Sequence, residues 1–290
     1  MIGLIIIIIV LFLLILASYI DIKTKEVPNL ISYSIIAVSL GLNLLQSIIT
    51  KQFSNTFYSF IGFFVFFSLG ILLYYTKQWG GGDAKLLMGI GAAFILFPKE
   101  LYKFFNPNLG NIPFILTILL NIFIIGSVYS ILWCIGLLIK NRSTKKILKI
   151  TFKDILESKI TNVWVILVSI TLLIAIINKN FGVLLFFTTI LVSLTYLLIR
   201  IIKVIEKKYL IKQIPTSKLT EGDWLVKNVL LKQKIVYQPS NTGISKEDIL
   251  KLKKLKIKNV MIKEGIPFVP AITLGVIISI VMGNLILIVA

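Results

Sequence analysis

Long apolar runs separated by short polar connections recur along the whole chain. Most of them approach or exceed the roughly 20 residues that a helix needs to cross the hydrocarbon core of a bilayer. They predict transmembrane helices at residues 2–20, 30–50, 57–76, 84–98, 113–139, 162–178, 181–203 and 267–289. We therefore expect an all-α polytopic membrane protein with about eight transmembrane helices. The first run lacks the basic start and the cleavage site of a secretory signal, so we expect a retained span.

Two stretches depart from this pattern. The run at residues 84–98 would rise only about 22 Å as a helix, so we expect its start to be recessed into the membrane behind a glycine-rich loop. Residues 204–266 carry strand-like segments at 224–231, 234–238 and 256–262, with turn residues between them. Ser245 and Asp248 form an N-cap pair for a short helix. This stretch predicts a small α+β domain between the last two spans.

The amino-acid composition agrees with a lipid environment and excludes several classes of enzyme mechanism. Hydrophobic residues make up 57% of the chain and charged residues 15%, and the mean hydropathy is +0.97, which is outside the range of soluble domains. The absence of histidine excludes Ser-His and Cys-His nucleophile pairs and the HExxH zinc motif. The single cysteine, Cys134, forms no intrachain disulfide. We expect neither a metal nor a cofactor.

The positive charges predict the orientation. If the N-terminus faces outside, 27 of the 31 Lys and Arg residues lie in the inner connections, and only Lys51, Lys99, Lys103 and Lys179 lie outside. The positive-inside rule therefore predicts a multi-pass protein of the cytoplasmic membrane with both termini outside. The net charge of +19 is then explained by anionic lipids at the inner face. Without a recognised motif or a patch of interleaved aromatic residues, nucleic-acid binding is not expected.

The inner connection at residues 143–160 is amphipathic. Leu148, Phe152, Ile155 and Leu156 share one face, and lysines surround them. This pattern favours a surface helix that lies on anionic lipid, with a plain basic connector as the alternative. We divide the chain into a catalytic membrane core (1–139), this segment with two further spans (140–203), the cytoplasmic α+β domain (204–266) and the last transmembrane helix (267–290).

Two of the twelve acidic residues lie at membrane-span ends on the same predicted side. Asp21 follows the first span, and Asp83 begins the fourth, after Gly80, Gly81 and Gly82. Two carboxyl groups that meet share a proton, so one acts as an acid and the other as a base. Each aspartate also has an ordinary interpretation, as a helix end or as an N-cap, and the glycines as a flexible turn.

The helix ends predict how the two acids divide the work. Asp21 is at the C-terminal end of its helix, where free carbonyl groups disfavour a negative charge, so we expect it to hold the shared proton. Asp83 is at a helix N-terminus, so we expect it to be the base that activates water.

The segment Gly80-Gly81-Gly82-Asp83-Ala84-Lys85 resembles the GxGD motif of intramembrane aspartic peptidases, in particular the type IV prepilin peptidases. Asp21, followed by a basic stretch that ends in Pro28 and Asn29, is similar to the first aspartate motif of that family. The Pro267-Phe268-Val269-Pro270 segment resembles the start of the family's last helix. The absence of the cysteine-paired zinc domain of many bacterial members makes the chain look more like archaeal preflagellin and prepilin peptidases.

The resemblance implies an aspartic endopeptidase with Asp21 and Asp83 as catalytic residues. It would remove the short basic leader from precursors of type IV pilins or archaellins at the cytoplasmic face. Glu26, near Asp21, is then a candidate contact for the leader, and its alternative is a solvated loop acid. A carboxylate-dependent ion or proton transporter is the competing function class, in which the in-span Asn121 would line a pathway. Otherwise Asn121 is an interhelical hydrogen-bonding residue.

Overall fold

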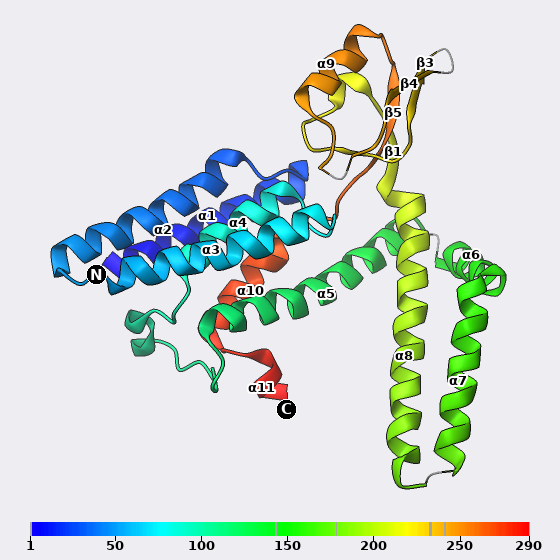
Figure 1. Ribbon diagram of the computed structural model, residues 1–290, viewed down its shortest axis with the longest axis horizontal. Helices are drawn as coiled ribbons and strands as arrows, with labels where there is room; N and C mark the ends of the chain where they lie inside the picture. The colour runs from blue at the N-terminus through cyan, green and yellow to red at the C-terminus, as the bar shows by residue number, and fades with distance from the viewer. Residues whose placement is uncertain (1, 143, 178, 232–233, 241, 290) are drawn as a thin grey trace. The chain divides into compact units, whose positions relative to one another are not determined.

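The computed structural model describes residues 2–142, 144–177, 179–231, 234–240 and 242–289 (Figure 1). The chain forms two compact units, one built from Met1–Ile131 and Gln213–Ala290 and the other from Leu132–Lys212. The division of the chain into four parts at residues 139, 203 and 266 stays a prediction.

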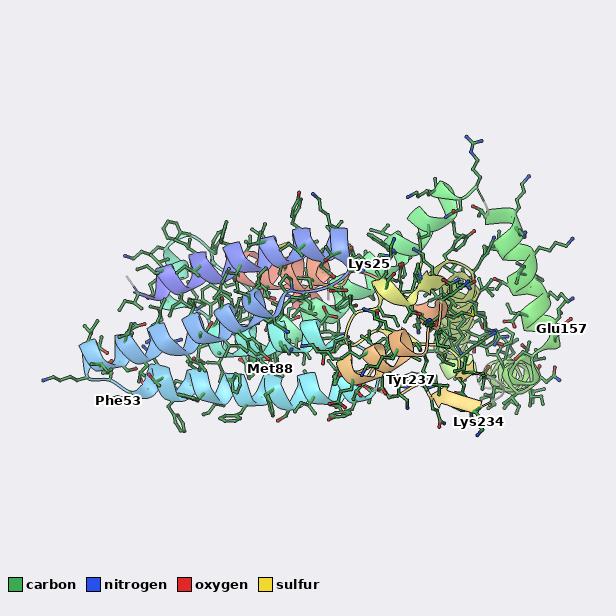
Figure 2. All side chains as sticks on the ribbon, turned by 90° about the horizontal axis from the view of Figure 1, so that it is seen from above. Lys25, Phe53, Met88, Glu157, Lys234 and Tyr237 are labelled. Atoms are coloured by element: carbon green, nitrogen blue, oxygen red, sulfur yellow. The ribbon has the colours of Figure 1, made fainter. Side chains whose placement is uncertain are left out.

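The membrane part of the first unit consists of helices that pack along one another. They are α1 (Ile2–Thr24), α2 (Asn29–Thr50), α3 (Ser54–Tyr75), α4 (Gly81–Ala93), the first part of α5 (Phe114–Lys140), α10 (Val269–Val281) and α11 (Leu285–Val289), with a 3-10 turn at Lys99–Lys103. Figure 2 shows Lys25 and Phe53 at opposite ends of this group, with Met88 of α4 between them. The turn after α1 therefore lies at one end of the group, and the turn between α2 and α3 at the other.

The short helix α4 is the centre of this group. Its 13 residues rise about 20 Å, less than the hydrocarbon thickness, and Leu86, Leu87 and Ile90 are fully buried. Helix α3 approaches it at two glycines, where a Cβ added to Gly91 would lie 2.3 Å from the Gly62 carbonyl oxygen. Glycine allows this close backbone contact, as in other packed membrane helices.

The last apolar segment is broken. Gly283 has a φ of +87°, a conformation that ends α10 and that glycine adopts without strain. The Asn121 side chain donates to Ser279 Oγ (2.9 Å) and to the Gly283 carbonyl (2.7 Å), and accepts from the Leu285 amide (3.1 Å). Asn121 thus forms the interhelical hydrogen bond that its in-span position predicts. With every one of these bonds internal to the protein, it serves packing.

Within the described residues, five helices are long and apolar enough to cross a membrane, or six if the bent pair of α6 and α7 counts as one span. The helical, multi-pass character is confirmed, but the count of eight is not. The expected spans at residues 84–98 and 267–289 correspond to α4 and α10, which have 13 residues each. The short α4 agrees with the short span expected there, whereas apolar composition could not show that α10 ends early, at Gly283 and the hydrogen bonds of Asn121.

The small domain has a mixed fold. A sheet with the order β1-β5-β2 stands beside a β3-β4 hairpin, and one helix, α9, packs on them. The elements are β1 (Ile211–Pro215), a 3-10 turn (Thr216–Lys218), β2 (Trp224–Leu225), β3 (Val229–Leu231), β4 (Lys234–Tyr237), α9 (Lys246–Lys254) and β5 (Asn259–Lys263). Ser245 caps α9 by accepting the Asp248 amide at 3.1 Å, so the predicted N-cap pair is confirmed. No pattern in the sequence predicted β1.

The second unit holds the end of α5, then α6 (Thr144–Glu157), α7 (Lys159–Ile177) and α8 (Lys179–Ile205), followed by a π-helical turn at Glu206–Leu210. Helices α7 and α8 run side by side (Figure 1). Helix α6 packs against α8 and is bent by 79° from α7.

Candidate active site

Asp21 lies in the last turn of α1 and is buried, with 4% of its surface exposed. The Val269 backbone N–H donates to Asp21 Oδ2 at 3.0 Å. Val269 is the first residue of α10, so a helix that is 248 residues away in the sequence supplies the partner. An unpaired N–H at a helix N-terminus is a suitable donor to a carboxylate, because it has no partner within its own helix.

Asp83 occupies the third position of α4 and closes the loop that precedes it. The Gly80 N–H donates to Asp83 Oδ2 at 3.1 Å, as in a capping box, and the Ala84 N–H donates to the Gly80 carbonyl at 3.1 Å. The side chain is therefore held by the backbone of its own motif. The ordinary N-cap interpretation is wrong in detail, because Gly80 takes the N-cap position.

The two carboxyl groups, from α1 and α4, lie close enough to interact electrostatically. Both accept a backbone N–H near a helix N-terminus, Asp21 from α10 and Asp83 from the start of α4. The C-terminal end of α1 by itself favours a protonated Asp21. The α10 terminus opposes the effect of the α1 terminus, so helix ends no longer distinguish the two acids.

The three glycines before Asp83 differ in how much space surrounds them. A Cβ added to Gly82 would lie 2.7 Å from the Val27 Cβ, whereas one added to Gly81 meets nothing nearer than 3.5 Å. At Gly80 the nearest atom is Asp83 Oδ2, at 3.3 Å. Gly82 therefore permits a close approach of the loop after α1, and Gly81, the variable position of GxGD, has room for a side chain.

Lys85 and Asn29 join the two motif segments. Lys85 Nζ donates to Asn29 Oδ1 at 2.7 Å and lies 5.3 Å from the centre of the Tyr33 ring. Pro28 occupies the N-cap position of α2, and its carbonyl accepts the Ile31 N–H at 3.0 Å. These contacts fix the start of α2 against α4.

Three aromatic residues from distant parts of the chain meet beside the motif. The rings of Trp79 and Phe268 are 5.3 Å apart, and those of Trp79 and Phe123 are 6.1 Å apart. Trp79 directly precedes Gly80, and Phe268 precedes the Val269 amide that binds Asp21. Gly126 of α5 leaves room for Phe268, since an added Cβ would lie 2.4 Å from its ring. The cluster thus joins the glycine loop to the start of α10.

Helix α10 is also fixed along its length. Thr273 Oγ1 donates to the Leu14 carbonyl of α1 at 3.2 Å and lies 2.7 Å from Ser18 Oγ. A Cβ at Gly275 would lie 2.8 Å from the Ile122 Cα of α5. These contacts hold the Val269 amide in register with Asp21.

Tyr129 is a further residue of this region that sequence reasoning missed. Its buried hydroxyl lies within electrostatic range of Asp21. It shares a face of α5 with Ile122, which contacts Gly275, and Gly126, which contacts Phe268, because these positions recur at helical spacing. That spacing, together with the C-terminal Pro-Phe-Val-Pro segment, was the signal that could have identified it.

Glu26 is exposed in the loop after α1, and the small domain brings other acids near it. Glu264 forms an ion pair with Lys25. The pKa of the Asp223 carboxyl is raised by burial, and by the charges of Glu26 and Glu264, against hydrogen bonds from Thr220 that lower it. The sequence showed Glu26 alone, because Asp223 and Glu264 reach this place only through the fold of the small domain.

Among the described residues, no group of three or more His, Cys, Asp or Glu side chains is arranged to hold a metal ion. The site described above consists of two carboxyl groups, the backbone amides that bind them and the aromatic cluster beside the glycine motif.

These features define a multi-pass helical membrane protein with a pair of aspartates, of which Asp21 is buried and Asp83 is half-buried. Residues 8–131, which contain both acids, match the model of the type IV leader peptidase family, and the resemblance noted in the sequence is confirmed for this region. A preflagellin peptidase of Methanococcus voltae is 32% identical over 130 residues, which are 45% of this chain and 55% of that protein.

Two further peptidases are also similar to part of this chain. A preflagellin peptidase of Methanocaldococcus jannaschii is 36% identical over 86 residues, 30% of this chain and 35% of that protein. The prepilin peptidase EppA of Methanothermobacter thermautotrophicus is 30% identical over 109 residues, 36% of this chain and 28% of that protein. The chain thus spans about half the length, or less, of the curated relatives it matches. No solved structure matches it.

Proposed function

We propose that this protein is an intramembrane aspartic endopeptidase that removes the short basic leader from type IV pilin-like or archaellin precursors. The observation that carries the proposal is that Asp21 and Asp83 lie on two helices that contact each other, α1 and α4, with Val27 after α1 packed on Gly82 and the two carboxyl groups within electrostatic range. The printed names of the relatives, preflagellin peptidase and prepilin peptidase, support the class of substrate.

The chemistry requires the two carboxyl groups to differ in protonation. The ionised carboxylate takes a proton from water, and the resulting hydroxide equivalent attacks the peptide carbonyl. The protonated carboxyl group donates to the carbonyl oxygen as negative charge develops there. Collapse of the tetrahedral intermediate then breaks the C–N bond, and the amine leaves with a proton from the dyad. Backbone donors at Gly80 and Val269 keep both acids in place throughout.

The proposed site faces the cytoplasm. This orientation rests on the distribution of Lys and Arg, which puts the loop after α1 and the loop before α4 on the inner side and both termini outside. A leader rich in Lys and Arg would meet a basic inner face, so its attraction needs local acids. Glu26, in the loop that follows Asp21, provides negative charge there, and Asp223 lies within electrostatic range of it, whereas Glu264 is paired with Lys25.

The test is co-expression of the full chain with pilin and archaellin precursors, with leader removal followed by gel shift. Asp21→Asn and Asp83→Asn should each reduce cleavage by at least about a hundredfold while membrane insertion is unchanged. Asp248→Asn is the matched control, because Asp248 lies in the small domain and an asparagine oxygen can still accept the Ser245 hydroxyl as Asp248 does. Substantial cleavage by either dyad variant would exclude the mechanism, and leaders left intact by the unaltered protein would exclude these substrates.

A further inference from the structure

Helix α6 is oriented across the axis of the pair α7 and α8. It packs against α8 and makes an angle of 79° with α7. Membrane-crossing helices tilt on average only about 20° from the bilayer normal. A helix nearly perpendicular to them therefore runs close to the plane of the membrane.

The faces of α6 carry different chemistry. Ile147 and Thr151 are buried, whereas Leu148, Phe152 and Leu156 are 48%, 65% and 75% exposed. These three apolar residues are four positions apart and form a continuous stripe. Lys149 and Lys153 border the stripe along one side, with Lys146 beyond them, and Lys145 lies at its N-terminal end. An exposed apolar stripe bordered by lysines is the pattern of a helix at the boundary between headgroups and acyl chains.

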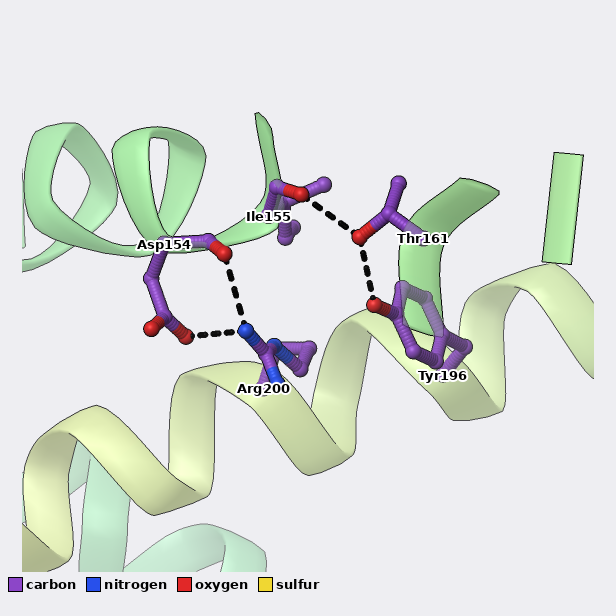
Figure 3. Close-up of polar contacts among 5 residues, drawn as sticks. All are labelled: Asp154, Ile155, Thr161, Tyr196 and Arg200. Atoms are coloured by element: carbon purple, nitrogen blue, oxygen red, sulfur yellow. Dashed lines mark hydrogen bonds and ion pairs between the residues drawn. The ribbon is translucent and has the colours of Figure 1, made fainter. Parts of the chain in front are cut away.

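A polar network fixes which face points outward (Figure 3). The Arg200 guanidinium of α8 pairs with Asp154 Oδ2 at 2.6 Å and donates to the Asp154 carbonyl at 2.9 Å. Thr161 Oγ1 donates to the Ile155 carbonyl at 2.5 Å and lies 2.9 Å from the Tyr196 hydroxyl. Because these bonds join α6 and the start of α7 to α8, the apolar stripe does not rotate inward.

A cavity lies where α6 meets the end of α8. Its volume is about 260 Å³, and it is lined by Ile150, Asp154, Val204, Lys207 and Lys208. The negative charge of Asp154 is balanced by Arg200, so the cavity retains the two positive charges of the lysines. Apolar Ile150 and Val204 line the same space. Two ammonium groups beside an apolar wall match a phosphate joined to a hydrocarbon chain.

We propose that this cavity is a binding site for an anionic phospholipid, whose phosphate contacts Lys207 and Lys208 while the apolar stripe of α6 inserts between neighbouring acyl chains. The site lies wholly within the second unit and does not depend on the proposed peptidase activity. A bound phospholipid would hold α6 in one leaflet of the membrane, in addition to the general attraction between its lysines and anionic headgroups.

Lipid retention tests the cavity. The full chain is reconstituted in mixed phosphatidylcholine and phosphatidylglycerol bilayers, transferred to mild detergent and examined by native mass spectrometry for bound lipid. Retained phosphatidylglycerol should fall about 30-fold in Lys207→Gln/Lys208→Gln, the product of two surface lysine contributions at low salt. Lys253→Gln/Lys254→Gln, an adjacent lysine pair in the small domain, should retain it fully. Equal retention by both double variants would overturn the proposal.

A competition arm distinguishes lipid from free phosphate. Inorganic phosphate or glycerol phosphate, added in detergent, should leave phosphatidylglycerol bound because neither fills the apolar wall. Displacement of the lipid by inorganic phosphate at matched concentration would show a soluble-anion site instead.

Depth measurements test α6 itself. In a Cys134→Ser background, a bimane label at Phe152→Cys should be quenched by nitroxide lipids, and one at Lys146→Cys, on the lysine face, should not. Stronger quenching at position 146 than at 152 would mean that the helix does not insert its apolar stripe, and would overturn the proposal.

Discussion

Charged side chains have different partners in two regions of the molecule: the dyad region, around Asp21 and Asp83, and the α6–α8 corner, where Asp154 of α6 meets Arg200 of α8. Asp21 and Asp83 are held by backbone amides in packed surroundings and have no cation as a hydrogen-bond partner among the contacts described. At the corner, Asp154 is neutralised by Arg200, and the remaining lysines are exposed. Backbone donors fix the position of a carboxylate without cancelling its charge. The first region is therefore suited to proton transfer, and the second to attachment.

Outside the two aspartates, the largest effect should come from Gly82→Ala. The added methyl group would lie 2.7 Å from the Val27 Cβ, so the loop after α1 or the start of α4 must move. Misplacement by about 1 Å costs on the order of a hundredfold in rate, and we expect that loss in leader cleavage. Gly81→Ala, where the nearest atom is 3.5 Å away, should cost at most a few-fold.

A second-site change sharpens this prediction. Val27→Gly removes the atom that the Gly82→Ala methyl group would strike, so the double variant should recover most of the lost activity. Failure of this rescue would show that Gly82 acts through backbone flexibility or substrate contact and not through packing against Val27.

Arg200→Met should have the next largest effect, on stability alone. The arginine side chain is 11% exposed and the Asp154 side chain 41%, so the pair is only partly buried. Removing the cation leaves a half-exposed acid without its partner, at a cost of about 1–2 kcal/mol. Thermal unfolding of the reconstituted protein should therefore occur at a lower temperature, with leader cleavage unchanged.

A double-mutant cycle with Asp154→Asn separates the pair from the arginine's other contacts. If Arg200→Met costs as much in the Asp154→Asn background as alone, the ion pair does not stabilise the corner. Loss of leader cleavage in Arg200→Met at a temperature where the protein stays folded would contradict the independence of the two regions.

Glu26→Gln should have a smaller effect, confined to substrate recognition. We expect the KM for leaders rich in Lys and Arg to rise about two- to fivefold, the range for an exposed charge pair, with kcat unchanged. Leaders with their charges neutralised should show no rise. Equal changes for both kinds of leader would identify Glu26 as an ordinary loop acid.

The sequence predicted most of the helices and brought both aspartates to attention, because apolar runs and a local glycine motif are visible without tertiary structure. It did not predict that Val269 binds Asp21 or that Trp79 meets Phe268, since these contacts join positions more than 180 residues apart. The short span at α4 was predicted, but the early end of α10 was not. That end depends on Gly283 and on the hydrogen bonds of Asn121, which apolar composition does not record.

The smallest effect concerns Asp223, in the domain that faces Glu26. Burial, together with the charges of Glu26 and Glu264, raises the pKa of its carboxyl above the unfolded value. The folded state therefore binds the proton more tightly than the unfolded state, so this group favours folding at low pH, and the contribution is lost as pH rises through the folded pKa. Asp223→Asn, which keeps an oxygen acceptor for the Thr220 N–H, removes this dependence.

Hydrogen exchange of the β2 and β5 amides, measured across mildly acidic to neutral pH, checks the sign. Relative to the unaltered protein, Asp223→Asn should become more protected as pH increases, and the difference should shrink in a Glu26→Gln background because one repelling charge is gone. The opposite trend, with the aspartate form gaining protection as pH increases, would show that the hydrogen bonds from Thr220 outweigh burial, and that Asp223 is a stabilising carboxylate and not part of a repelling acidic group.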